Sequence, residues 1–474
     1  MLYFAPNSNQ DSPNPVQVDK EKEWQDLNRY QDVFGQLPML QAYSHIILTF
    51  SMPQNVSQEE IIKDIENAMR KVEEKVPWMA AQIVNVGKAP GYSGVNKYAP
   101  CPPAERPVVV KDVSDAFPTY AEVKRLKAPI NMLDSAFLSP CSSFPQPFHG
   151  SEEDPARVIR LQVSFINGGI FLNFVLHHAT GDAGGHFWLA RMIAMAMRGE
   201  EFPESFLEEA NRDRRKLFPL LGPDEPMLDH SHLLRPPITA DNPIVTPTTT
   251  TWHFFRLTAA KMAKLKDLAS QKEGFEPGVP YITTDDAISA FCWQRFITAR
   301  LPRLDLNTVA KFSRTIDGRK SLGISSNYLG DVIHNVQTHV SVKDLTEKPL
   351  STIASRMRKR LNEVSNAYHV RSFASFIMSQ PDKSTITYGG RVNTETDIGS
   401  SSVRAAELYF DFGKLGRPDF VRRPCLKGVS CPGLLAFLPQ NPDGDCDFIA
   451  ALTEADVAVL NKDPVWTSYV EYIG

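Results

Sequence analysis

Two adjacent histidines, His177 and His178, end a short apolar run and precede a polar turn. Neutral imidazole suits the removal of a proton near neutral pH, because its ordinary pKa is about 6.5. His178 is therefore a candidate general base. A lone histidine at the end of a strand is more often a structural residue with satisfied hydrogen bonds, so position alone leaves both interpretations open.

Asp182 follows His178 by four residues. In a helical turn both side chains would share one face, whereas in a non-helical turn Asp182 would point away and pair with an arginine. A metal site is a further alternative, because His178, Asp182 and His186 recur every four residues. Zn²⁺ would need all three on one regular helix, and Gly184 with Gly185 argues against that. We therefore expect no bound metal.

The residues around this turn predict a strand, a turn and a helix. Residues 170–176 are nearly all apolar and rich in β-formers, as is typical of a buried strand. The sequence 180–182, Thr-Gly-Asp, supplies turn and cap residues before a helix expected from about His186 to Met197. Alternating apolar residues over 159–165 and the Asn-Gly-Gly turn after them make the 170–176 strand half of a hairpin.

Composition places the chain among ordinary globular enzymes. It has 474 residues, of which 42% are hydrophobic and 22% charged, and a net charge of −4. Its 51 basic and 55 acidic residues create no strong positive field to attract phosphate, which argues against nucleic acid as the main partner. Six cysteines without a CxxC pair indicate free thiols in a reducing compartment, so we expect a cytoplasmic protein. No apolar stretch approaches the length of a membrane span, so no membrane association is expected. As a separate expectation, the protein is a monomer.

Strand and helix patterns lie on both sides of a proline-rich stretch. A capping box at Ser57 and Glu60 begins a helix that Pro77 ends, strands are expected at 43–50, 78–84 and 107–112, and helices at 259–270, after Thr284, and near 350–363 and 370–380. We therefore expect a mobile arm over 1–25 rather than a signal peptide, an N-terminal domain over 26–202, a crossover over 203–250 and a C-terminal domain over 251–474.

Several stretches together resemble the BAHD acyltransferases. His178-Ala-Thr-Gly-Asp182 fits their HxxxD motif, the sequence 411–416 looks like their DFGWG motif, and Asp317-Gly318-Arg319 with Asn-Tyr-Leu-Gly at 327–330 resembles the segment between them. The resemblance is closest to the fungal trichothecene 3-O-acetyltransferases and extends from about residue 33 to the C-terminus. It is carried by GQLPMLQAY (35–43), VPWMAAQI (76–83), TTDDAISAF (283–291), SSNYLG (325–330), FDFGKLGRPDFVRRP (410–424) and PDGDCDFIAAL (442–452).

The resemblance implies an α/β fold and a reaction. The fold would have two similar domains with mixed β-sheets and flanking helices, like chloramphenicol acetyltransferase, and an active-site channel at their interface. The reaction would be acyl transfer from acetyl-coenzyme A or another acyl-coenzyme A to a hydroxyl of a fungal secondary metabolite, trichothecene-like or other. No metal is implied, and the absence of a GxSxG motif agrees with direct transfer.

The same resemblance assigns the site residues. His178 is the expected general base, and Asp182, paired with Arg319, is structural. Asp411 and Gly413 are also expected as structural residues at the active site. Ser401 is a candidate donor to the acyl group or its oxyanion.

The sequence departs from the family pattern at three places, and two other functions stay open. Lys414 occupies the fourth DFGWG position with one additional residue before the last glycine, Ala183 replaces a glycine, and the sequence 400–402 is Ser-Ser-Ser without the expected tryptophan. We therefore expect the acceptor pocket to lack a bulky wall. The alternatives are N-acylation of an alkaloid or amine, and a non-catalytic, condensation-like binding module.

Overall fold

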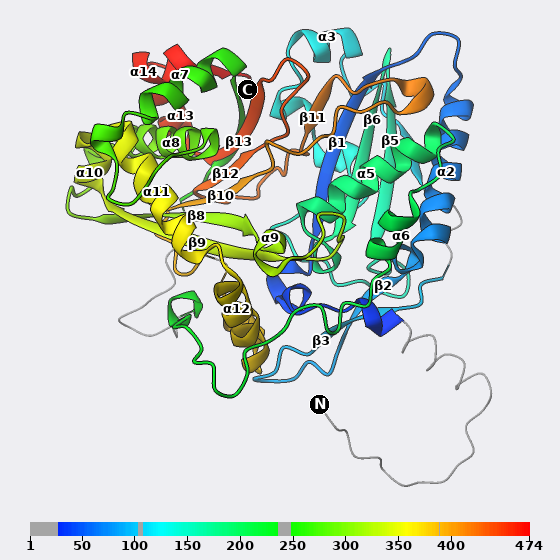
Figure 1. Cartoon of the computed structure of the whole chain (residues 1–474). Coiled ribbons are helices and arrows are strands. Elements are labelled where there is room, and N and C mark those ends of the chain that lie inside the picture. Colours follow the sequence, from blue (N-terminus) through cyan, green and yellow to red (C-terminus); the bar gives the residue numbers. More distant parts are fainter. Residues whose placement is uncertain (1–26, 103–107, 236–247, 388) are drawn as a thin grey trace.

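The computed structural model describes residues 27–102, 108–235, 248–387 and 389–474 (Figure 1). The arm expected over 1–25 lies outside these residues. The described strands form two large mixed sheets and a small hairpin. In spatial order, the first sheet contains β11 (Phe420–Arg422), β1 (Tyr43–Ser51), β6 (Gly169–His177), β5 (Ile159–Ile166) and β4 (Val109–Asp112).

The second sheet is built from the C-terminal half of the chain. In spatial order, its strands are β14 (Val470–Tyr472), β7 (Thr251–Leu257), β13 (Cys446–Leu452), β12 (Leu434–Phe437), β10 (Ile398–Ser402), β8 (Val309–Asp317) and β9 (Ile333–Ser341). The hairpin pairs β2 (Gln82–Val86) with β3 (Val95–Ala99). One strand crosses between the halves, because β11 comes late in the chain but pairs antiparallel with β1 of the first sheet.

Helices pack on one face of each large sheet. The helices of the N-terminal half are α2 (Gln58–Lys75), α3 (Tyr120–Arg125), α4 (Ser135–Leu138), α5 (Ala183–Met197) and α6 (Glu204–Ala210). Those of the C-terminal half are α7 (Ala259–Ala269), α8 (Thr284–Arg300), α9 (Arg319–Leu322), α10 (Val342–Glu347), α11 (Leu350–Val364), α12 (Ala367–Ser379), α13 (Glu454–Leu460) and α14 (Pro464–Tyr469). Helices α2 and α5 pack on one face of the first sheet, and α8 and α11 pack on one face of the second. No helix of the described residues is long and apolar enough to span a membrane.

Neighbouring residues of β1 and of β13 belong to different cores, and this alternation shows that the two sheets pack against each other. On β1, Leu48 packs with α2 and α5 in one core, whereas its neighbour Ile47 belongs to a different core. On β13, Phe448 packs with α8 and α11, whereas Ile449 joins the core of Ile47. Since successive side chains of a strand point to opposite faces, this shared core lies between the two sheets. The space available to a ligand lies beside it.

Most of the expected strands and helices are present. Those that differ from the expectation differ in the residue at which they begin. The capping box of Ser57 and Glu60 begins α2 as predicted. The strand expected over 78–84 is wrong in its first part, because Pro77 begins a 3₁₀ turn over Pro77–Ala80 and β2 starts only at Gln82. The helix expected from about His186 begins at Ala183 instead, because Asp182 caps it.

Candidate active site

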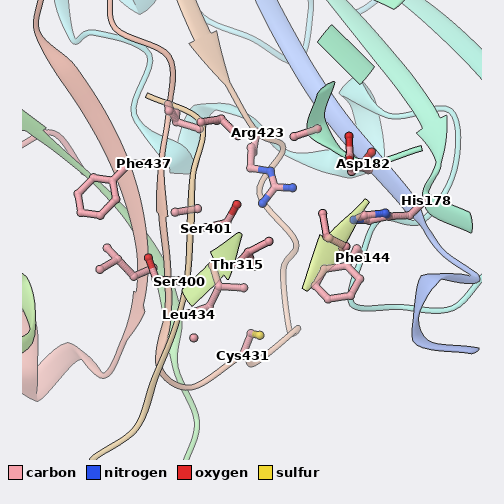
Figure 2. Close-up of a pocket in the computed structure, with 18 of the residues that line it drawn as sticks. Phe144, His178, Asp182, Thr315, Ser400, Ser401, Arg423, Cys431, Leu434 and Phe437 are labelled. Carbon is pink, nitrogen blue, oxygen red and sulfur yellow. The ribbon is translucent and has the colours of Figure 1, made fainter. Parts of the chain in front are cut away.

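A cavity of about 360 Å³ lies between the two sheets (Figure 2). Residues of both halves line it: His178 and Asp182 come from the end of β6 and the start of α5, and Ser401 comes from β10. Most of the other lining side chains are apolar, among them Met39, Leu40, Ile46, Phe144, Val403, Val421, Leu434 and Phe437. A mostly apolar cavity with a few polar groups is typical of a small-molecule site.

His178 and His177 face different spaces. A 3₁₀ turn, His178–Thr180, follows β6, and the backbone N–H of His178 donates to the Ala42 carbonyl at 2.8 Å. Figure 2 shows the His178 ring beside Phe144, pointing into the cavity, and the two ring centroids are 6.1 Å apart. The ring of His177 instead packs 5.1 Å from that of Tyr43 and lines a second cavity. Only His178 of the two can therefore act on a ligand in the central cavity.

The imidazole of His178 is held in its neutral form. Burial lowers its pKa, and the charge of Arg423 lowers the pKa further, whereas the charge of Asp182 opposes this. The side chain keeps 21% of its surface exposed, but its Nδ1 is buried. Nε2 is then the ring nitrogen left to face the cavity. A neutral imidazole is the form that accepts a proton.

Asp331 stands behind this ring. Its Oδ1 lies 3.9 Å from Nδ1 of His178, and the residue is fully buried. Neither carboxyl oxygen has a hydrogen-bond partner among the described residues. Burial raises the pKa of Asp331 well above its usual range, and the nearby Asp182 and Asp32 raise it further, whereas the charges of Arg319 and Arg214 oppose this. The sequence reasoning missed this residue, although it directly follows the Asn-Tyr-Leu-Gly segment.

Asp182 makes structural contacts with both carboxylate oxygens. Arg319 donates to these oxygens at 2.7 and 2.9 Å, and the N–H groups of Gly184 and Val332 donate at 2.9 and 3.2 Å. Arg319 also donates to the backbone carbonyls of Tyr328 and Gly330. The pair thus joins the start of α5 to the two segments that the resemblance placed between the main motifs.

Gly181 and Gly185 allow the backbone at Leu329 to approach the turn that follows His178. A Cβ atom on Gly181 would lie 2.4 Å from the Leu329 carbonyl oxygen, and one on Gly185 would lie 2.1 Å from the same atom. Both contacts are too short for any side chain, so the backbone of Leu329 fixes glycine at both positions. The turn that presents His178 is therefore shaped by packing against the C-terminal half of the chain.

The four-residue spacing of His178, Asp182 and His186 does not assemble a metal site. His186 makes hydrogen bonds through Nδ1 with the Ser44 hydroxyl and through Nε2 with the Phe174 carbonyl, each at 2.9 Å. Asp182 is bound by Arg319. Across the residues that the structure describes, no group of three potential ligands could hold a metal ion.

Asp411 and Gly413 lie outside the cavity lining. Asp411 is exposed, and its carboxylate accepts the Gly413 N–H at 2.7 Å. Gly413 has φ +67°, and a Cβ atom there would lie 2.9 Å from the carbonyl oxygen of Met197, the last residue of α5. Lys414, the departure from the family pattern, forms an exposed ion pair with Asp64 of α2 at 2.9 Å. This turn packs against the end of α5 and not against the ligand space.

Ser401 lines the opposite wall of the cavity from His178, and Arg423 reaches the space between them (Figure 2). Arg423 follows β11 directly. In the sequence, Arg423 appears only as the second of two adjacent arginines in the FDFGKLGRPDFVRRP stretch. No pattern showed that Arg422 and Arg423 would have different surroundings.

Comparison with known proteins agrees with this geometry. The Transferase family profile matches residues 130–466, and a profile described as "Trichothecene 3-O-acetyltransferase-like N-terminal domain" matches residues 42–197. The chain is 58% identical to the O-acetyltransferase epaC of Aspergillus niger, over 95% of this chain and 98% of that protein. It is 32% identical to the trichothecene 3-O-acetyltransferase TRI101 of Fusarium sporotrichioides, over 94% and 96% of the two chains.

A solved structure gives the same fold. The crystal structure of F. graminearum TRI101 complexed with coenzyme A and T-2 mycotoxin superposes with a TM-score of 0.86 at 30% identity, and the match covers 94% of this chain and 99% of that one. The family match, the fungal O-acetyltransferase relatives and the shared two-sheet fold lead to one conclusion: the chain belongs to the Transferase family of acyltransferases, the BAHD acyltransferases.

Proposed function

We propose that the enzyme transfers an acetyl group from acetyl-coenzyme A directly to a hydroxyl of a fungal secondary metabolite, with His178 as general base. The observation that carries the assignment is a neutral imidazole, with Nδ1 buried, pointing into a cavity between the two sheets. Two comparisons support an acetyl-coenzyme A donor and a metabolite acceptor. Relatives of this chain are named O-acetyltransferases, and TRI101 has been crystallised with coenzyme A and a toxin.

In the proposed reaction, Nε2 of His178 removes the hydroxyl proton while the acceptor oxygen attacks the thioester carbonyl. A carbon–oxygen bond forms, and the tetrahedral intermediate then loses the carbon–sulfur bond. The imidazolium returns the proton to the departing thiolate, so the enzyme ends in its starting form. Burial favours this cycle because a neutral base is present before the acceptor binds.

Two groups near the base have supporting roles. Burial raises the pKa of Asp331, and we propose that its carboxyl is protonated, which leaves the imidazole without a fixed counter-charge and favours the neutral form in the free enzyme. Ser401 is the proposed donor to the oxyanion, since its strand forms the cavity wall opposite His178. Asp182 and Arg319 hold the turn, and Asp411 with Gly413 fixes the far end of α5.

We also propose that residues 26–202 and 251–474 are two domains joined by 203–250, because a separate helix-covered core supports each sheet. β11 is the strand that the second half adds to the first sheet. The six free cysteines support a reducing, cytoplasmic compartment.

The test is incubation of the purified protein with acetyl-coenzyme A and a panel of fungal sesquiterpenoid and polyketide alcohols, with matched amines. Mass spectrometry identifies the acetylated product, and free thiol release gives the rate. Formation of an ester that depends on His178 supports the proposal. Exclusive acetylation of amines would replace it with N-acylation, and no turnover of free acetyl-coenzyme A with any acceptor would contradict it.

A further inference from the structure

Two adjacent arginines after the DFG turn have opposite surroundings. The Arg422 guanidinium donates to the Asp447 carboxylate at 2.7 Å and to the backbone carbonyls of Ala128 and Lys127 at 3.0 and 2.6 Å. Arg423, half-buried, has neither a hydrogen bond nor an ion pair within the described part of the chain. Figure 2 shows its guanidinium projecting into the central cavity, between Ser401 and His178.

The contrast extends to the buried arginines besides Arg422. Each has a carboxylate partner within 3.5 Å: Arg214 with Asp32, Arg300 with Asp456, Arg314 and Arg358 with Asp286, and Arg319 with Asp182. A guanidinium taken out of water without an anionic partner lowers the stability of a fold. Arg423, half-buried at the cavity, differs from these arginines because it has no such partner among the described residues.

No lining residue neutralises Arg423. Asp182, the carboxylate in the lining, is already paired with Arg319. Cys431 also lines the cavity, but burial raises the pKa of its thiol, which therefore stays protonated at neutral pH. His178 and His186 stay neutral, because burial lowers the pKa of both. The cavity thus carries one uncompensated positive charge among mostly apolar side chains.

We propose that Arg423 selects the acceptor by binding an oxygen anion on it, and that the preferred acceptors combine an apolar body, the hydroxyl to be acylated and a planar carboxylate or ionised enol. A planar guanidinium fits such a group through two parallel hydrogen bonds. The apolar walls suit the body of the acceptor, and His178 lies on the other side of the charge. The inference rests on the proposed acyl transfer and specifies its substrate class.

The experiment compares one acceptor in two charge states. Hydroxymethyl-naphthoate and its methyl ester carry the same alcohol, and kcat/KM is measured for each with acetyl-coenzyme A. The wild type should prefer the acid. Arg423→Met should lower the ratio of acid to ester by about tenfold to a hundredfold, the effect of losing a charge-assisted hydrogen bond, and Arg423→Lys should restore part of it. Arg417→Met removes an exposed arginine of the same segment, outside the cavity lining, and should leave the ratio unchanged.

Calorimetry separates this inference from the proposed reaction. The naphthoate is titrated into each protein without acetyl-coenzyme A, and melting temperatures confirm that the variants are folded. Tighter binding of the acid than of the ester, lost in Arg423→Met, supports the inference even if neither compound is acetylated. Equal binding of acid and ester by the wild type would overturn it, and this comparison needs no variant. An equal loss of kcat/KM for both acceptors in Arg423→Met would also overturn it, by placing Arg423 on the thioester.

Discussion

The turn from His178 to Asp182 and the turn from Asp411 to Gly416 lie at opposite ends of α5. Asp182 caps the first residues of this helix, and Gly413 packs against the carbonyl of its last residue, Met197. The first turn faces the cavity and carries the proposed base, whereas the second packs against the helix end outside the cavity lining. The two segments lie more than two hundred residues apart in the sequence, and one helix brings them into one structural unit.

The comparison separates the proposed base from the residues proposed to hold its geometry. His178 points into the cavity, whereas Asp182 and Gly413 contact the two ends of α5. Substitutions at the two turns should therefore differ in kind: loss of rate with the fold intact at His178, and loss of stability at the others.

The largest effect is expected at the base. His178→Ala should lower kcat/KM at least about a hundredfold, the usual contribution of a positioned general base, with little change in melting temperature. His177→Ala is the matched control, because its ring packs on Tyr43 and faces the other cavity. The His177→Ala variant should have a lower melting temperature than the wild type, and it should lose less activity than His178→Ala. Comparable rate losses in both variants would remove the distinction.

The ion pair at the start of α5 should show the largest effect on stability. Asp182→Ala and Arg319→Ala should each destabilise the fold by about 3–5 kcal/mol, because each leaves a buried charge without its partner. Chemical denaturation gives the free energies, and the double variant should lose less than the sum of the two. A variant of Asp182 with normal stability and reduced kcat alone would place this carboxylate in the chemistry.

The second turn should show a smaller effect. Gly413→Ala places a Cβ atom 2.9 Å from the Met197 carbonyl oxygen at a positive φ, so a destabilisation of about 1–3 kcal/mol is expected. Lys414→Met removes only an exposed ion pair and should cost less than about 1 kcal/mol. Thermal unfolding measures both. If Lys414→Met were the more damaging, packing at the end of α5 would not explain this turn.

The smallest effect is expected at Asp331. Burial raises the pKa of this carboxyl, and the proposed reaction has it protonated, so Asp331→Asn keeps both shape and charge and should change kcat/KM at neutral pH only slightly. Asp331→Ala, which removes the group behind the imidazole, is the comparison. A large loss in Asp331→Asn would indicate an ionised carboxylate that stabilises the imidazolium.

The sequence predicted the local unit better than its surroundings. Strand, turn and helix around His178 followed from apolar runs and cap residues, which act over a few positions. The carboxyl of Asp331, the free guanidinium of Arg423 and the close approach of Leu329 to two glycines depend on segments more than a hundred residues away. Local patterns carry no information about which distant backbone will fill a space. The resemblance supplied Arg319, but not the difference between Arg422 and Arg423.

The pH dependence of kcat/KM for the acceptor tests the central claim most directly. Burial lowers the pKa of His178, so the neutral base should be fully present at neutral pH and lost as the pH falls through that lowered pKa. The account predicts a plateau above about pH 6.5, an acid limb with an apparent pKa below about 6.5, and no such limb in the residual activity of His178→Ala. An acid limb centred above that value, or the same limb in His178→Ala, would contradict the assignment of His178 as the general base.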